Sequence, residues 1–143
     1  MYRVAELVMY GRISKLCYKL NLGKYEQAIE YYDNALEIDP KYALALSNKG
    51  ATLDKLGKYK EAIECYDKAL EIDPKYALAL SNKGWALHNL GKYEQAIEYY
   101  DNALEIDRNF DQALYNKSAT LAYIRLRLKG EKKSGWKKFL KRD

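Results

Sequence analysis

The sequence predicts an all-α protein in which antiparallel helix hairpins stack side by side into a solenoid. The segment LGKYEQAIEYYDNALEID occupies residues 22–39 and recurs unchanged at residues 90–107, and residues 56–73 repeat it with four substitutions. The copies begin 34 residues apart. Within each copy, apolar residues recur at three- and four-residue spacing, which is typical of the buried face of an amphipathic helix.

One unit, residues 43–76, predicts two helices of about 14 residues each. Leu46, Gly50 and Leu53 lie along one face of the first helix. The second half repeats the pattern with tyrosine, alanine and isoleucine residues, and charged residues occupy the opposite face. Each unit is therefore expected to form a helix hairpin.

Turn residues separate these helices. Gly57 is placed to end the first helix in the left-handed conformation, which costs glycine no steric penalty. Asp73 and Pro74 follow the second helix and supply a hydrogen-bond acceptor and a residue without an amide hydrogen. These signals predict a stop at the end of each unit.

Gly50 and Gly84 lie inside the predicted first helices, where glycine costs about 1 kcal/mol relative to alanine. Close approach of the second helix offsets this cost through dispersion contacts. We therefore expect each glycine to face a small residue of the second helix, Ala62 or Ala96. A single hairpin has too little core to be stable, so about three stacked units are needed.

Helix hairpins that repeat every 34 residues resemble the tetratricopeptide repeat family. The small, aromatic and proline landmarks of that family fall on Gly50, Ala62, Tyr66, Ala69 and Pro74, and then on Gly84, Ala96, Tyr100 and Ala103. Departures are mild, such as Leu46 and Leu80 for tryptophan, Lys49 and Lys83 for leucine, and Arg108 for the closing proline. The resemblance implies a right-handed superhelix of about three and a half repeats over about residues 9–128.

The expected divisions are a divergent repeat at 9–42, repeats at 43–76 and 77–110, a final first helix at 111–128, and a basic tail or capping helix at 129–143. The first repeat is expected to begin with a helix of about residues 3–21, with Cys17 as the small residue and a turn into Lys24. Ser118 occupies the small-residue position of the last helix. The ends thus depart most from the repeat.

The resemblance also implies a function, because the first helices of this family line a concave groove that binds a peptide or helix of a partner protein. The corresponding groove residues here are Leu44, Ser47, Asn48, Leu78, Ser81, Asn82, Trp85, His88, Asn89, Tyr115, Asn116 and Tyr123. We predict a non-enzymatic protein interaction scaffold.

Three features of the groove have alternative interpretations. Trp85 stands where the neighbouring repeats have alanine, so it is either an interface anchor or a residue that fills space. Asparagines recur at 48, 82 and 116, and they either hydrogen-bond an extended ligand or support the neighbouring repeat. His88 is either a pH-sensitive contact or an ordinary hydrogen-bonded side chain.

Some members of the family hold the C-terminal carboxylate of heat-shock chaperones with paired lysines and asparagines. The corresponding lysine positions here are Leu44, Ser47, Leu78, Ser81 and Gln112. This clamp is therefore not expected.

The net charge of +5 is unevenly distributed, because residues 125–143 hold nine basic and two acidic residues. The charges of this tail that are available to an anionic partner are Lys132, Lys133, Lys137, Lys138, Lys141 and Arg142. Trp136, Phe139 and Leu140 lie at helical spacing, which favours a helix that caps the stack. The alternative is an arm that binds nucleic acid or another anionic surface, and this is the less favoured function.

Other classes are not expected. Charges interrupt every window long enough for a membrane span, and Arg3, Glu6 and Arg12 disrupt a signal peptide, so a cytoplasmic location is predicted. Two distant cysteines imply no disulfide framework. A single histidine and no convergent nucleophile predict no enzyme, metal or cofactor. A third function class is self-assembly through the incompletely capped C-terminal end.

Overall fold

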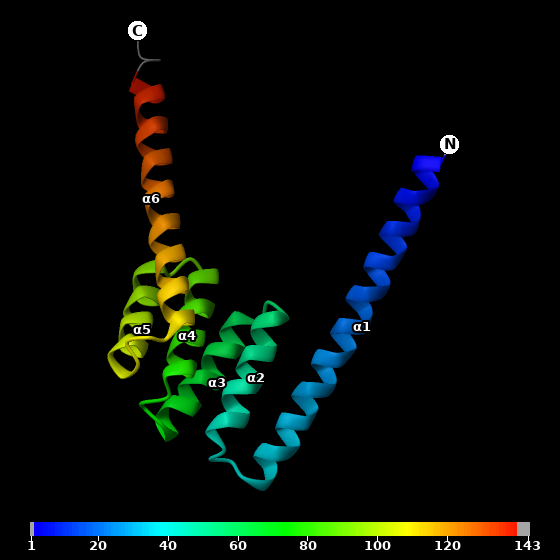
Figure 1. The fold of residues 1–143 in the computed structure, drawn as a ribbon, viewed down its shortest axis with the longest axis vertical. Coiled ribbons are helices and arrows are strands. Elements are labelled where there is room, and N and C mark those ends of the chain that lie inside the picture. The colour runs from blue at the N-terminus through cyan, green and yellow to red at the C-terminus, as the bar shows by residue number, and fades with distance from the viewer. Residues whose placement is uncertain (1, 140–143) are drawn as a thin grey trace.

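The computed structural model describes residues 2–139, with side chains described at 15, 16 and 18–130. Its helices are α1 (Tyr2–Ile38), α2 (Ala43–Lys55), α3 (Tyr59–Ile72), α4 (Ala77–Asn89), α5 (Tyr93–Ile106) and α6 (Asp111–Phe139), and these described residues contain no strand. Figure 1 shows α2 to α5 packed together, while the two terminal helices extend away from them and diverge.

Adjacent helices pack in pairs, which confirms the predicted fold class. The hairpins α2–α3 and α4–α5 make the most extensive contacts, and each second helix also packs on the first helix of the next repeat. In the same way, α1 packs on α2 and α5 packs on α6. First helices are thus α2, α4 and α6, and second helices are α3, α5 and the C-terminal half of α1.

The turns inside the hairpins form as predicted. Gly57 and Gly91 have φ values of 73° and 78°, in the region that glycine adopts without strain. The amide of Lys58 donates to the carbonyl of Leu53 at 2.9 Å, which satisfies one of the free carbonyls at the end of α2.

The turns between repeats depend on an aspartate. The carboxylates of Asp39, Asp73 and Asp107 accept hydrogen bonds from the amide two residues later at 3.0, 3.1 and 3.0 Å. Arg108 follows the last of these aspartates, where the other two turns have proline. The turn therefore forms without the family's closing proline.

Each helical glycine provides space for a tyrosine ring, which corrects the expectation that it faces an alanine. A Cβ added at Gly50 would lie 2.6 Å from Cε1 of Tyr66, and one at Gly84 would lie 2.6 Å from Cε1 of Tyr100. Both rings are fully buried. The alanine expectation holds in part at Gly84, because the added atom would also lie 3.1 Å from the carbonyl oxygen of Ala96.

Lysines link successive repeats. Lys49 pairs with Asp33, Lys83 with Asp67, and Lys117 with Asp101, each at 2.5 Å. Each pair joins a first helix to the second helix of the preceding repeat. The lysines that replace the family's leucine therefore keep a role in stacking.

The predicted N-terminal hairpin does not form, because α1 continues through Gly23 without a turn. Gly50 and Gly84 have no glycine equivalent in the preceding segment, where Leu16 or Cys17 stands at the small-residue position. Without hairpin contacts, the intrinsic helix propensity of the segment determines its conformation at Gly23. One glycine inside a helix costs only about 1 kcal/mol, so the helix continues. The side chains of Leu16 and Leu20 remain exposed, and that of Cys17 lies outside the described residues.

The C-terminal helix is also longer than predicted. It begins at Asp111 as expected but passes the boundary at residue 128 and reaches Phe139. Lys132, Lys133, Lys137 and Lys138 lie on this extension, although their side chains are outside the described set. Leu140, Lys141 and Arg142 lie outside the described residues.

Tyr66 also connects the two helices of its hairpin by a hydrogen bond. Its hydroxyl donates to Oδ2 of Asp54 at 2.7 Å. The other carboxylate oxygen of Asp54 has no hydrogen-bond partner within the described part of the chain. Burial raises the pKa of the Asp54 carboxyl from 3.8 to about 6, and the hydrogen bond from Tyr66 opposes part of that rise.

We predict that Gly84→Ala destabilises the protein by up to about 2 kcal/mol. The substitution gains about 1 kcal/mol of helix propensity, but overpacking against the Tyr100 ring and a fixed backbone oxygen costs about 1–3 kcal/mol. Gly23→Ala is the matched control, because no atom lies within 4 Å of its added Cβ. Urea unfolding should show opposite signs for the two variants, and stabilisation by Gly84→Ala would contradict the packing described.

The Asp54 carboxyl predicts a dependence of stability on pH. Because its folded-state pKa of about 6 lies above the ordinary 3.8, the folded state binds the proton more tightly than the unfolded chain. Stability therefore falls as the pH rises from about 4 to about 6. Asp54→Asn removes the charge, so it should be more stable than the wild type by about 1 kcal/mol at pH 7, with allowance for partial exposure, and about equal at pH 4. A difference that does not change with pH in urea titrations would refute this assignment.

Candidate partner-binding groove

The first helices lie next to one another, as the predicted groove requires. α4 contacts both α2 and α6, so the candidate residues lie on three neighbouring helices. Their exposure separates them into three classes. Leu44, Trp85, Asn89, Tyr115 and Tyr123 are exposed, Asn48, Leu78, Asn82 and His88 are half-buried, and Ser47, Ser81 and Asn116 are buried.

The buried candidates face the packing between helices. Ser47 and Ser81 are almost fully enclosed, and their hydroxyl oxygens have no hydrogen-bond partner among the described residues. Their small side chains occupy the same position in successive repeats. Of the residues in this groove set, only the exposed and half-buried ones have side-chain surface that is accessible to solvent.

The periodic asparagines differ from one another in their surroundings. Oδ1 of Asn82 accepts a hydrogen bond from Nε2 of Gln112 at 3.0 Å, which links α4 to α6. Asn116 is buried, and its carbonyl accepts a hydrogen bond from Thr120 at 2.9 Å. Asn48 is half-buried. Its carbonyl accepts the equivalent hydrogen bond from Thr52 at 2.9 Å. All three asparagines thus make a hydrogen bond within the protein, Asn82 through its side chain and the other two through the backbone.

An aromatic cluster of Trp85, His88, Tyr93 and Tyr123 lies where α4, α5 and α6 meet. The rings of Trp85 and His88 stack at 5.4 Å with an interplanar angle of 3°. The ring centroids of Tyr93 and Tyr123 lie 5.2 and 5.9 Å from that of His88, and both rings are steeply inclined to the His88 ring. The centroids of the two tyrosine rings are 4.9 Å apart. Trp85 remains 39% exposed, so the cluster presents an open aromatic surface.

Hydrogen bonds fix the orientation of His88. Its Nδ1 lies 2.8 Å from Oγ1 of Thr120, and the Thr120 hydroxyl donates its proton to the carbonyl of Asn116. Nδ1 must therefore carry the proton in the Thr120 contact, which leaves Nε2 as the acceptor of the neutral ring. Burial lowers the pKa of His88, so the neutral form is favoured at pH 7.

Sequence reasoning missed Tyr93 as a member of this cluster. Tyr93 recurs at the repeat period with Tyr25 and Tyr59, which indicates a packing role. Its position in the sequence could have indicated this role, because Tyr93 comes directly after the turn that follows His88. His88 and Tyr123 have no aromatic counterparts one repeat earlier, so they give this tyrosine neighbours that its equivalents lack.

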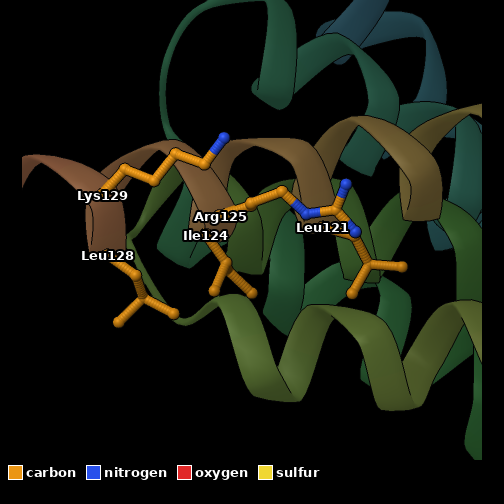
Figure 2. A pocket seen from close by; sticks show the side chains of 5 residues that line it. All are labelled: Leu121, Ile124, Arg125, Leu128 and Lys129. Atoms are coloured by element: carbon orange, nitrogen blue, oxygen red, sulfur yellow. The ribbon is translucent and has the colours of Figure 1, made fainter.

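A second feature that sequence reasoning missed lies on another face of α6. Leu121, Ile124, Arg125, Leu128 and Lys129 line a hollow there, and none of them is a groove candidate. Figure 2 shows Leu121, Ile124 and Leu128 projecting from the same side of the helix. This face is apolar with a basic margin.

Two classes of site are not seen in the described part of the chain. No three histidine, cysteine, aspartate or glutamate side chains gather there as a metal site would require. None of the helices described has an apolar stretch long enough to span a bilayer. Cys65 is a free, buried cysteine, and burial raises the pKa of its thiol.

Comparison with solved structures finds the same helical arrangement in other domains, two of which were solved with a peptide. The first domain of Spaghetti (RPAP3), solved with the HSP90 peptide SRMEEVD, has 25% identity and a TM-score of 0.69 over 74% of this chain and 84% of that one. The second domain of human RPAP3, solved with the HSP70 peptide SGPTIEEVD, has 32% identity and a TM-score of 0.65 over 68% and 82%. The Sgt2 domain from Aspergillus fumigatus has 31% identity and a TM-score of 0.71 over 76% and 74%.

Sequence comparison gives the same assignment. No curated protein matches the chain at the level required for a relative. The tetratricopeptide repeat family model matches residues 43–76 and 77–110, which are the α2–α3 and α4–α5 units. A second model, described as TPR repeat, matches residues 20–57 and so includes the C-terminal half of α1. The chain belongs to the tetratricopeptide repeat family.

Proposed function

We propose that this chain is a non-enzymatic scaffold that binds a peptide or helix of a partner protein in its concave groove, with the aromatic cluster as the anchor. The observation that carries this proposal is Trp85, which is partly exposed although no packing rule of the repeat requires an aromatic residue there. Exposed tryptophans are among the commonest anchors of protein interfaces. The peptide complexes of the two related domains support the same class of function.

The cluster is organised before a partner arrives. The ring of His88 covers one face of the Trp85 indole, and the hydrogen bond with Thr120 fixes His88. Asn89 donates to the carbonyl of Trp85 at 2.9 Å, which leaves its amide oxygen to accept a hydrogen bond from a ligand. Less side-chain entropy is lost on binding when the anchor is already held in place.

The chemistry of the groove favours an apolar or aromatic side chain of the partner over an acidic tail. Ser47 and Ser81 stand at positions that the chaperone clamp needs for lysine, and both are buried. The periodic lysines Lys49, Lys83 and Lys117 pair with aspartates of the preceding repeat. The partner that fits best therefore presents an apolar side chain against the indole.

We expect Trp85→Ala to weaken binding of a groove ligand about 30-fold, since truncating an anchor residue costs about 2 kcal/mol. Ligands are first selected from a displayed peptide library on the wild-type chain, and their affinities are then measured by calorimetry. Tyr31→Ala is the matched control, because Tyr31 is an exposed aromatic on α1 outside the groove. Equal affinities of the wild type and Trp85→Ala for every selected peptide would reject the anchor.

The choice between an apolar and an acidic ligand needs a separate measurement. The peptide SRMEEVD, which the related Spaghetti domain binds, should bind this chain no more tightly than a peptide of the same composition in scrambled order. The reason is the absence of lysine at the clamp positions Leu44, Ser47, Leu78, Ser81 and Gln112. Sequence-specific binding of SRMEEVD would instead assign the chain to the chaperone-tail class.

A further inference from the structure

The final first helix has an apolar face without the second helix that covers its equivalents. Leu114 and Leu121 of α6 are 43% and 46% exposed, whereas Leu46 and Leu53 of α2 are 6% and 3% exposed. The difference arises because α3 covers α2, while α6 has no following helix in the described chain. Ser118 lies between the two leucines and is also exposed. We call Leu114, Ser118 and Leu121 the uncovered face of α6.

A complementary face is uncovered at the other end of the chain. Ala28, Tyr32 and Ala35 of α1 are half-buried. The equivalent residues of α3 and α5, which are Ala62, Tyr66 and Ala69 and then Ala96, Tyr100 and Ala103, are all 0% exposed. The first helix that encloses those residues in the other repeats is missing here, because α1 does not turn back at Gly23. We call Ala28, Tyr32 and Ala35 the uncovered face of α1.

The two faces match because their sequences belong to the two sides of one hairpin. Residues 22–39 are identical to residues 90–107, and the latter segment contains α5, which packs on the first helix α4. The uncovered face of α1 therefore has the side chains that fit a first helix. α6 is a first helix that lacks such a partner.

Net charge also favours this pairing. Residues 22–39 hold one lysine and five acidic residues, for a net charge of −4. Residues 111–130 hold four basic residues and one acidic residue, for a net charge of +3. Opposite charges on two surfaces accelerate their encounter and disfavour pairing of either surface with itself.

We propose that the chain assembles head to tail, with α6 of one copy packed antiparallel on residues 25–38 of a second copy, as α4 packs on α5. This register places Leu114 near Ala35, Ser118 near Tyr32 and Leu121 near Ala28 of the second copy. The contact joins two different surfaces. Every assembly therefore keeps a free α6 face at one end and a free α1 face at the other, and further copies add at both ends.

Ser118 sets a limit on the strength of this contact. It occupies the position of Gly50 and Gly84, where an added Cβ lies within 2.6 Å of a tyrosine ring. The Tyr32 ring of the second copy must therefore shift from the position that Tyr66 and Tyr100 adopt in their hairpins, which weakens the contact. Assembly should be reversible and depend on protein concentration.

The test uses light scattering of the full chain from about 1 µM to about 500 µM. Leu121→Asp blocks the face on α6 and Ala28→Glu blocks the face on α1. Leu126→Asp is the matched control, because Leu126 is 68% exposed on the same helix but lies away from the uncovered face. Circular dichroism verifies that each variant keeps the helical content of the wild type.

The wild type and Leu126→Asp should both rise above the monomer mass of 16.7 kDa with increasing concentration. Leu121→Asp and Ala28→Glu should each remain monomeric alone. Their equimolar mixture should reach twice the monomer mass and then stop, because the two faces that remain in such a dimer both carry a blocking substitution.

Three results would overturn the proposal. A wild type that stays monomeric over the whole range would mean that residues 1–21 or 129–143 cover these faces within one chain, or that nothing does. Assembly of either blocked variant alone would mean that a face pairs with itself. A mixture that stays monomeric would mean that the two faces do not pair.

Discussion

The packing of a tyrosine ring onto a helical glycine is the contact on which the rest of this structure depends. At Gly50 and Gly84 the missing Cβ leaves the space that the rings of Tyr66 and Tyr100 fill. Glycine weakens the first helix, but the two helices gain the close contact that completes their hairpin. Where this pairing is present, a hairpin forms. In α1, where no glycine stands at that position, the helix continues past the expected turn at Gly23.

The same contact explains why the two ends differ from the middle. The sequence LGKY occurs in three places, yet the glycine adopts a positive φ at Gly57 and Gly91 and remains helical at Gly23. The local sequence is identical, so the difference must come from the helix that precedes it. This dependence on the preceding segment also exposes an unpaired face at each end of the chain, one on α1 and one on α6.

Much of the fold could be predicted from the sequence because its apolar, glycine and aspartate residues recur at the same positions in each repeat. The two central hairpins and the turns at Gly57 and after Asp73 follow from spacing and from the chemistry of glycine and aspartate. The straight path of α1 could not be predicted in this way, because periodicity aligns Gly23 with two true turn glycines. The identity of the residue that fills the glycine space was also out of reach, since Tyr66 and Ala62 lie on the same face of the second helix.

For the candidate groove, the repeat pattern predicted that the residues lie on neighbouring first helices but did not predict how deeply each side chain is buried. Ser47 and Trp85 were candidates on equal terms, yet one is buried and the other is exposed. The burial of each side chain depends on how closely the neighbouring helices approach, and the sequence of one repeat does not determine that distance. The aromatic cluster needed three helices to come together, so Tyr93 became visible as a member only in three dimensions.

The most direct test of the glycine–tyrosine contact is a nuclear Overhauser spectrum of the folded chain. We expect strong cross-peaks between the Hα protons of Gly50 and Gly84 and the ring protons of Tyr66 and Tyr100, and none between residues 13–20 and the ring of Tyr32. Absence of the first pair of signals would contradict the packing on which the hairpins depend. Contacts from residues 13–20 to the Tyr32 ring would show a closed N-terminal hairpin and contradict the uncovered face of α1.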